Sequence, residues 1–403
     1  MSHLVVTRCR LCDAELPPPA LVLEDQPAAN NLCETAEDAL CAPRYPLGLV
    51  RCRACTSVQL TATVDPQVLF GNYTYVPVGS AFAAHWEELA ESVGAGAGFA
   101  IEIGSNRGDL LGVLKARGWD VLGVEPAKGL AHLANDRGLP TLPDFFTEQV
   151  AGQIAADRGR ARLIVATNVF AHIHDLPAVV RAVKRLLHPA GRFVFEVASL
   201  ARDYEQGTFD RVLYAEHVFA HSVAPLHDLF LAHGMRIAQV DDIEFHGGSL
   251  RVAVEHGTGE SADVRTRIAK ELEPVGTATV AALDAFALRT HRTITRIRDG
   301  LGELRRQGKR VVGFTAPAKA SVVLNACGLT PATIQYLADD NPLKVGRFVP
   351  GAAIPIMPMS ALLEDHPDVV VLWSWNLAEG LIPRLPSGLR VIIPLPEWRE
   401  VTT

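Results

Sequence analysis

The sequence predicts an α/β protein with a small amino-terminal zinc-binding part, a central doubly wound sheet and a third unit that begins with another strand, turn and helix. Cysteine pairs cluster near the amino terminus, in a stretch too small to fold on its own core without a metal. Two later stretches, 99–117 and 310–326, each read as an apolar strand that turns into a helix. These positions predict domains over residues 1–70, 71–260 and 261–403.

The amino-terminal stretch contains two C-x-x-C pairs, Cys9–Cys12 and Cys52–Cys55, separated by 39 residues. Four thiolates from two such pairs can surround one tetrahedral zinc ion. Two disulfides are the alternative, but a reducing compartment favours zinc. A closed four-sulfur site has no open position for chemistry, so we expect one structural zinc.

Composition excludes several classes of protein. The 403 residues are 48% apolar and 21% charged, and the net charge of −7 with no basic tract argues against a nucleic-acid partner. No apolar run reaches the eighteen or so residues that a membrane span needs. The first seven residues lack the pattern of a signal peptide, so we expect a cytoplasmic protein.

The glycine turn after residues 99–103 is the strongest sequence signal of a cofactor site. The predicted strand ends at Gly104-x-x-x-Gly108, and a predicted helix over 110–117 follows. Such a turn places backbone N–H groups beside a bound ligand. Glu102 lies within the strand end and could meet the cationic end of a cofactor such as S-adenosylmethionine. Glu125 ends the next strand, where an acid commonly accepts hydrogen bonds from ribose hydroxyls. A plain strand-turn-helix is the alternative.

Strands and helices alternate regularly as far as residue 256. This pattern predicts a doubly wound sheet whose last strand is reversed, with its ligands at the carboxyl ends of the strands. The predicted strands are 99–103, 120–124, 162–167, 190–196, 235–243 and 249–255. Their carboxyl ends carry Gly104, Glu125, Asp144, Phe145, Phe146, Asn168–His172 and Glu196.

Two clusters of polar residues lie on or just after these strand ends. One runs from Asn168 to His174, and the other, from Phe209 to His217, places Tyr214, Glu216 and His217 within four positions. Histidine titrates near neutrality, and a neighbouring carboxylate can fix its tautomer. A single histidine is more often structural, but three on one rim favour chemistry.

The carboxyl-terminal third begins with predicted helices over 262–273 and 278–306. The predicted strands are 310–314, 333–338, 368–374 and 389–394. Lys319 stands at the start of the helix that ends at residue 326, a position that suits an anion or a diphosphate. A lysine on a solvated helix turn is the alternative.

With these motifs placed, the whole chain resembles the three-domain sugar C-methyltransferases of antibiotic-sugar biosynthesis, with matching stretches from Cys9 to about Glu397. The resemblance implies a zinc domain, a central class I (Rossmann-like) methyltransferase domain that uses S-adenosylmethionine, and a Rossmann-like carboxyl-terminal domain that holds a nucleotide. The implied substrate is a nucleotide sugar, a dTDP-linked 4-keto-deoxysugar methylated on a carbon beside its ketone. We expect a monomer.

The resemblance also implies roles for individual residues. The implied zinc ligands are Cys9, Cys12, Cys52 and Cys55. The implied cofactor-binding residues are Glu102, Gly104, Asn106, Gly108, Glu125, Pro126, Asp144, Phe145, Phe146 and Asn168. The implied catalytic residues are Tyr75, His172, Tyr214, Glu216 and His217, and the implied substrate-binding residues are Tyr75, Lys319, Lys344 and Asn376. One departure is the family's Gly-x-Gly-Ala turn, which reads Gly313-Phe-Thr-Ala-Pro317 here.

The implied reaction needs a carbon nucleophile, which forms when a base removes a proton beside a ketone and donors stabilise the enolate. We assign His217 as the base, with Glu216 orienting or charging it. Tyr214, Tyr75 and His172 are candidate donors or proton relays. The alternatives are O- or N-methylation of a sugar or related substrate, and a non-catalytic zinc-bearing binding or scaffold protein.

Overall fold

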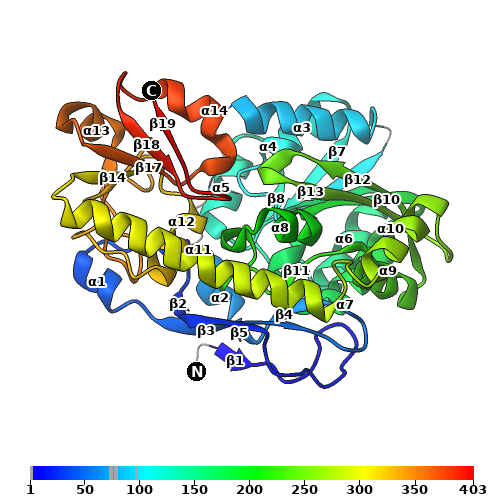
Figure 1. Ribbon diagram of the computed structural model, residues 1–403. Coiled ribbons are helices and arrows are strands. Elements are labelled where there is room, and N and C mark those ends of the chain that lie inside the picture. Colours follow the sequence, from blue (N-terminus) through cyan, green and yellow to red (C-terminus); the bar gives the residue numbers. More distant parts are fainter. Residues whose placement is uncertain (1–2, 72–75, 77–79, 97) are drawn as a thin grey trace.

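A computed structural model describes residues 3–71, 76, 80–96 and 98–403 (Figure 1). Tyr75, one of the predicted site residues, lies outside the described residues. Among these residues the strands form sheets of two, four, seven and six strands. None of the described helices is long and apolar enough to cross a membrane.

The amino-terminal part is built from short antiparallel strands. Its strands are β1 (His3–Val5), β2 (Leu21–Pro27), β3 (Arg44–Arg51), β4 (Val58–Leu60) and β5 (Ala62–Val64), and its helices are α1 (Ala36–Leu40) and α2 (Pro66–Phe70). The four-stranded sheet has the order β2-β3-β4-β11, and β11 (Phe219–Ala220) comes from a distant part of the sequence. The zinc-binding part therefore shares a sheet with the region that follows the second histidine cluster (Figure 1).

The central sheet has the order β12-β13-β10-β9-β6-β7-β8. Its strands are β6 (Phe99–Ile103), β7 (Asp120–Val124), β8 (Thr141–Leu142), β9 (Ala161–Thr167), β10 (Leu187–Ala198), β12 (Met235–Ile243) and β13 (Ser249–His256). The strands from β10 to β8 are parallel, whereas β13 pairs antiparallel with both β10 and β12. The predicted doubly wound sheet with a reversed last strand is confirmed, and the reversed strand lies inside the sheet rather than at its edge.

Helices cover this sheet because their apolar residues recur at helical spacing. The helices of the central part are α3 (Ser80–Ser92), α4 (Asp109–Ala116), α5 (Lys128–Asp136), α6 (Glu148–Arg158), α7 (Leu176–Leu186), α8 (Leu200–Gln206), α9 (Val223–Ala232) and the short η1 (Phe170–His172), η2 (Phe209–Arg211) and η3 (Phe245–Gly247). Helix α7 illustrates the local causes. Asp175 caps it by accepting the Ala178 N–H at 3.0 Å, and Leu176, Val180 and Val183 are buried along one stripe.

The carboxyl-terminal part holds a six-stranded sheet of order β16-β15-β14-β17-β18-β19. Its strands are β14 (Val311–Phe314), β15 (Leu337–Asp339), β16 (Ile356–Pro358), β17 (Val369–Leu372), β18 (Arg390–Ile393) and β19 (Arg399–Thr402). Its helices are α10 (Ala262–Leu272), α11 (Val280–Arg306), α12 (Ala318–Ala326), α13 (Met359–Asp365), α14 (Ala378–Leu381), η4 (Trp375–Leu377) and η5 (Ile382–Arg384).

The strand predicted over 333–338 is wrong in its first four residues. The N–H groups of Thr333 and Ile334 both bond to the carbonyl of Thr330, at 2.8 and 3.0 Å, and form a turn instead. Strands β16 and β19 were not predicted from the sequence. Each is an edge strand of three or four residues, and such strands give too short an apolar pattern to recognise.

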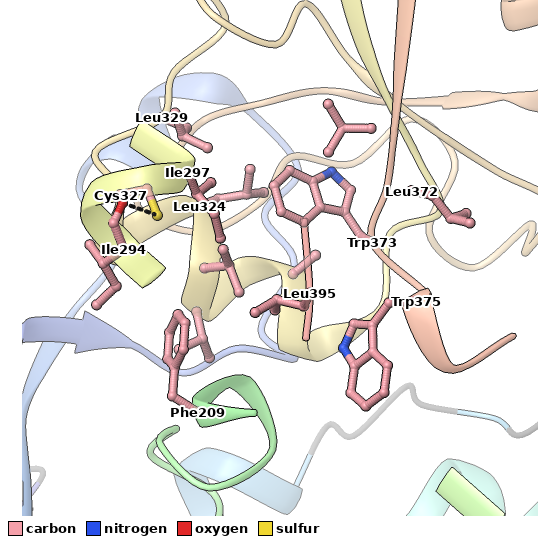
Figure 2. Close-up of a cluster of buried hydrophobic side chains, with 14 of the residues drawn as sticks. Phe209, Ile294, Ile297, Leu324, Cys327, Leu329, Leu372, Trp373, Trp375 and Leu395 are labelled. Carbon is pink, nitrogen blue, oxygen red and sulfur yellow. Dashed lines mark hydrogen bonds between the residues drawn. The ribbon is translucent and has the colours of Figure 1, made fainter. Parts of the chain in front are cut away.

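One hydrophobic core joins all three parts of the chain. It contains Leu47 of β3, Phe209 of η2, Phe286 of α11 and Val312 of β14, all at most 1% exposed. Figure 2 shows a portion of it, in which Phe209 lies in one cluster with residues of α11, α12 and the carboxyl-terminal sheet. The boundaries predicted at residues 70 and 260 stay predictions, but residues on both sides of each pack together.

A buried hydrogen bond links the central and carboxyl-terminal parts beside this core. The indole N–H of Trp375 donates to Asp210 Oδ2 at 2.9 Å, and Asp210 is 1% exposed. Trp375→Phe should therefore lower the free energy of unfolding by about 1–3 kcal/mol, because it leaves a buried carboxylate without a donor. Urea denaturation followed by fluorescence measures the change.

Trp398→Phe is the matched control. Its indole donates to Glu400 at an exposed position, 3.1 Å away, so its loss should shift the urea midpoint much less. Equal shifts for the two variants would contradict the importance of the buried bond.

Candidate active site

The four predicted zinc ligands lie together. The ligand atoms of Cys9, Cys12, Cys52 and Cys55 are all within 4.8 Å of one another. The Sγ atoms of Cys9 and Cys55 are 3.5 Å apart and those of Cys12 and Cys52 are 3.6 Å apart, far longer than a disulfide. A tetrahedron with Zn–S bonds of about 2.3 Å requires sulfur separations of about 3.8 Å. The thiols therefore fit one zinc ion, and four protein ligands leave no position for a reacting group.

The turn after β6 requires glycine at both predicted positions. Gly104 has φ +69°, and an added Cβ would lie 2.5 Å from Val169 Cγ2. Gly108 has φ +79°, and a Cβ there would lie 2.9 Å from Leu139 Cδ1. Both positions combine a left-handed backbone with a close approach, so a larger residue would displace the turn.

Glu125 fixes the shape of that turn from the tip of β7. Its Oε2 accepts the Asn106 N–H and its Oε1 accepts the Ala127 N–H, each at 2.8 Å. Burial raises the pKa of this carboxyl, and the two backbone donors lower it in part. A carboxylate has about four acceptor positions, so two remain for ligand hydroxyls.

Glu102 is the least satisfied acid of this edge. The residue is 3% exposed, and its Oε2 has no hydrogen-bond partner among the described residues. Burial raises its pKa well above the usual value, and the charges of Glu125 and Asp109 raise it further. A buried carboxyl with one oxygen that lacks a donor would be stabilised by a cationic group. This fits the positively charged end of S-adenosylmethionine.

The other predicted cofactor residues lie along the same edge of the sheet. Asn168 follows β9 with φ +56° and donates its N–H to the carbonyl of Glu196 at 2.8 Å. Asp144 is exposed after β8, and Pro126 and Phe145 are half-buried. Phe146 is 8% exposed and packs in the hydrophobic core of the central sheet, so its side chain has a structural role at this edge.

The structure brings the two histidine clusters together. A tight turn, closed by the His217 N–H donating to Tyr214 O at 2.9 Å, places the Tyr214 hydroxyl in hydrogen-bond contact with His217 Nε2. The other ring nitrogen, Nδ1, lies 2.8 Å from the carbonyl oxygen of Arg211. A carbonyl only accepts, so Nδ1 carries the proton and Nε2 holds a lone pair toward the hydroxyl.

His172 lies beside this pair. Its ring centroid is 4.8 Å from that of His217, and its Nδ1 is 2.7 Å from the backbone oxygen of Glu216. Burial lowers the pKa of His172, and burial followed by the charge of His172 lowers that of His217 well below its usual value. Both shifts favour the neutral form of the ring, in which Nδ1 carries the proton toward a carbonyl and Nε2 is an acceptor.

Glu216 does not orient His217, contrary to the expectation. Its side chain points to the amino-terminal part, where Oε1 accepts the backbone N–H of Asn30 at 3.0 Å and its Nδ2 at 3.4 Å. The residue is 1% exposed, and burial raises its pKa. The carbonyl of Arg211 fixes the tautomer of His217 in its place.

Arg211 is a residue that the sequence did not reveal. It is 6% exposed, and its guanidinium donates to the carbonyls of Gly247 and Gly248, each at 2.6 Å, while its Nε lies 3.3 Å from Asp203. These contacts hold the carbonyl that fixes His217. The only available signal was an arginine inside the 209–217 cluster, and a pattern cannot show that an arginine is buried.

The predicted substrate residues of the carboxyl-terminal part form two groups. The ammonium of Lys319 donates to Asn376 Oδ1 and lies 4.5 Å from the centre of the Trp375 ring. Burial lowers the pKa of Lys319 to about 8. Lys344 instead donates to the carbonyl of Ala316 at 2.9 Å, in a pocket lined also by Asn30.

The turn after β14 repeats the arrangement seen at Glu125. Asp339, at the tip of β15, accepts the Ala316 N–H through Oδ2 and the Asn341 N–H through Oδ1, both at 2.9 Å. An acid at the tip of the second strand thus fixes the first turn in both Rossmann-like sheets.

The thiol geometry predicts about one equivalent of zinc in the purified protein, measured by metal analysis. Cys12→Ser should lower the zinc content, because it removes one of four ligands. Cys41→Ser, at another exposed cysteine, should retain it. Less than about half an equivalent in the wild-type protein would contradict the site.

Comparison with known proteins agrees with this geometry. Three family models match: "Putative zinc binding domain" over residues 9–70, "Methyltransferase domain" over 94–240 and "C-methyltransferase C-terminal domain" over 244–396. The C-methyltransferase NovU of Streptomyces niveus is 35% identical over 98% of this chain and 97% of its own.

Solved methyltransferase structures resemble less than half of the chain. One from Clostridium acetobutylicum ATCC 824 has a TM-score of 0.36 and 13% identity, and it covers 45% of this chain and 93% of its own. The magnesium protoporphyrin IX methyltransferase of Synechocystis PCC 6803 has a TM-score of 0.31 and 13% identity, covering 44% and 77%. On the full-length match and the three domain models, this chain belongs to the three-domain C-methyltransferase family: it is a methyltransferase whose cofactors are S-adenosylmethionine and one zinc ion.

Proposed function

We propose that this enzyme methylates a carbon beside the ketone of a nucleotide-linked 4-keto-deoxysugar, with dTDP as the nucleotide. The observation that supports this most is the half-buried cluster of Tyr214, His217 and His172 beside the carboxyl edge of the central sheet, in which a backbone carbonyl at Nδ1 fixes the tautomer of each imidazole. We also propose that it works in the cytoplasm, since four free thiols at metal spacing suit a reducing compartment, and that it is a monomer.

Bound S-adenosylmethionine supplies an electrophilic methyl group, and Glu102, Gly104 and Glu125 are the residues that would hold it. The protein's own task is to make the substrate carbon nucleophilic. A carbon beside a ketone loses its proton only when a base is in reach and the enolate is stabilised. Both needs call for groups whose tautomers are fixed by their neighbours.

His217 is the proposed base. Its Nδ1 proton is committed to the carbonyl of Arg211, so the lone pair on Nε2 is the one that accepts a proton. The Tyr214 hydroxyl stands against this lone pair. Tyr214 can therefore pass a substrate proton to His217, or move aside and give His217 direct access.

His172 suits the role of relay better than that of donor. Its Nδ1 proton is committed to the carbonyl of Glu216, and burial keeps the ring neutral. Its Nε2 then accepts rather than donates hydrogen bonds. The donor to the enolate oxygen would be Tyr214 or Tyr75, and the second of these is outside the described residues.

The substrate would reach this cluster from the carboxyl-terminal part. Lys319 and Asn376 are already paired beside Trp375, whose indole bonds to Asp210, four residues before Tyr214. Together with Lys344 they are the proposed contacts of the nucleotide portion. A cation at the amino-terminal end of a helix suits a diphosphate.

Glu125→Ala should weaken binding of S-adenosylmethionine by about 1.5–3 kcal/mol, because it removes acceptors for ligand hydroxyls and the anchor of Asn106. Isothermal titration calorimetry measures the affinity. Asp120→Ala is the control, because Asp120 begins the same strand at the opposite edge and pairs with Arg158. Unchanged affinity in a folded Glu125→Ala protein would remove Glu125 from the cofactor site.

His217→Asn should abolish turnover and leave cofactor affinity intact, because it acts only on the step that makes the nucleophile. The direct measurement is exchange of the substrate's α-hydrogen with deuterated water, in the presence of S-adenosylhomocysteine and a panel of dTDP-4-ketosugars. In wild-type enzyme with labelled cofactor, the product should carry a new carbon-linked methyl group.

His172→Asn is the matched comparison. In this variant the exchange of the substrate's α-hydrogen should become slower but should not be lost. Near-normal exchange in His217→Asn, with none in His172→Asn, would reverse the two roles. If the product carried its new methyl group on oxygen or nitrogen, the proposal of C-methylation would be wrong, and the reaction would be O- or N-methylation.

A further inference from the structure

The segment that carries Tyr214 and His217 is held at two points by the zinc-binding part. The first is the partly buried bond between Glu216 Oε1 and the backbone N–H of Asn30, 3.0 Å long. The two residues are 186 positions apart, so this bond ties the amino-terminal part to the catalytic turn. Glu216 is 1% exposed, which keeps water from competing for the bond.

The second point of attachment begins at Val218, two residues after Glu216. Strand β11 pairs antiparallel with β4, with Phe219 opposite Gln59 and Ala220 opposite Val58. The Leu60 N–H also donates to the carbonyl of Val218 at 3.0 Å. His217 therefore lies between two attachments, one immediately before it and one immediately after it.

Gln59 connects the second attachment to the metal site. Its Nε2 lies 3.1 Å from Cys9 Sγ, and its Oε1 accepts the Arg10 N–H at 3.1 Å. The side chain is fully buried, and the Cys52 N–H bonds to the carbonyl of Ser57, directly before the same strand, at 2.8 Å. The residue that touches a zinc ligand is thus the residue that pairs with the catalytic segment.

We propose that the zinc-binding part is a positioning element for the catalytic turn, with Gln59 and Glu216 as its positioning residues. The metal fixes the hairpin that leads into β4, β4 fixes β11, and β11 with Asn30 fixes the backbone of Tyr214 and His217. The proposal rests on the proposed function for the roles of Tyr214 and His217. Its structural content, that zinc orders residues 214–220, does not.

The cofactor site should be indifferent to this coupling. Glu102 lies on β6, and Gly104 and Glu125 directly follow β6 and β7. The buried residues of these two strands pack in clusters that contain no residue of β4, although one cluster includes Val218 and Phe219. Loss of zinc should therefore loosen the catalytic turn and leave the affinity for S-adenosylhomocysteine within about twofold.

The test is hydrogen–deuterium exchange with no substrate present, on wild-type protein, Cys12→Ser and the control Cys41→Ser. In Cys12→Ser, amide exchange over 214–220 should rise by at least about tenfold, while peptides of β6 and β7 are unchanged. The same variant should lose kcat in methyl transfer with little change in KM for S-adenosylmethionine. Cys41→Ser should match wild type throughout.

Gln59→Ala covers the case in which Cys12→Ser unfolds. It keeps all four thiols and should retain bound zinc, yet raise exchange over 214–220 and lower kcat by about tenfold, the scale for partners of metal ligands. Unchanged exchange over 214–220 in folded Gln59→Ala and in folded zinc-free protein would overturn the proposal. Because exchange needs no substrate, a wild-type enzyme inactive on ketosugars would count against the proposed function alone.

Discussion

The segment from Thr208 to Ala220 forms hydrogen bonds with the amino-terminal part, the central part and the carboxyl-terminal part of the chain. The geometry of the site depends on these bonds. Asp210 receives the indole N–H of Trp375, Arg211 holds the two carbonyls at the tip of the closing hairpin, and Glu216 receives the N–H of Asn30. Asp210, Arg211 and Glu216 cannot move without breaking one of these hydrogen bonds. A backbone carbonyl can fix the tautomer of His217 only because the backbone itself is fixed this firmly.

This arrangement carries a cost in buried polar groups. Glu102, Asp210 and Glu216 each keep one buried oxygen without a hydrogen-bond partner among the described residues. Such groups are expensive to bury, and a fold selected for stability alone would replace them with apolar side chains. Their position around the cofactor edge and the catalytic turn suits groups that await a ligand or hold a neighbour in place.

The sequence revealed the features that depend on local chemistry. The glycines at 104 and 108 were predictable because a strand that turns tightly into a helix needs φ > 0, and the four thiols because their spacing is that of a zinc site. The carboxyl edge of the parallel sheet likewise collected the predicted cofactor residues on one side.

Features that depend on long-range packing were out of reach. Glu216 follows Tyr214 and precedes His217 in sequence, yet its carboxylate bonds to Asn30, and no periodicity records a partner 186 positions away. The burial of Arg211 and of Phe146 depends in the same way on elements that assemble only in the fold. Strand β15 was misplaced because a turn at Thr330 captured the residues that an apolar pattern assigned to it.

The shared core has a consequence for chimeric enzymes. The core residues of β3, η2, α11 and β14 pack into one cluster, so the parts that look modular in sequence are not interchangeable pieces. A graft of the carboxyl-terminal part of a relative would replace α11 and the surroundings of Trp375. The grafted residues would then have to pack against the original Phe209. Successful recombination would have to carry residues 208–213 with the graft, which places the crossover point inside the central part instead of near residue 260.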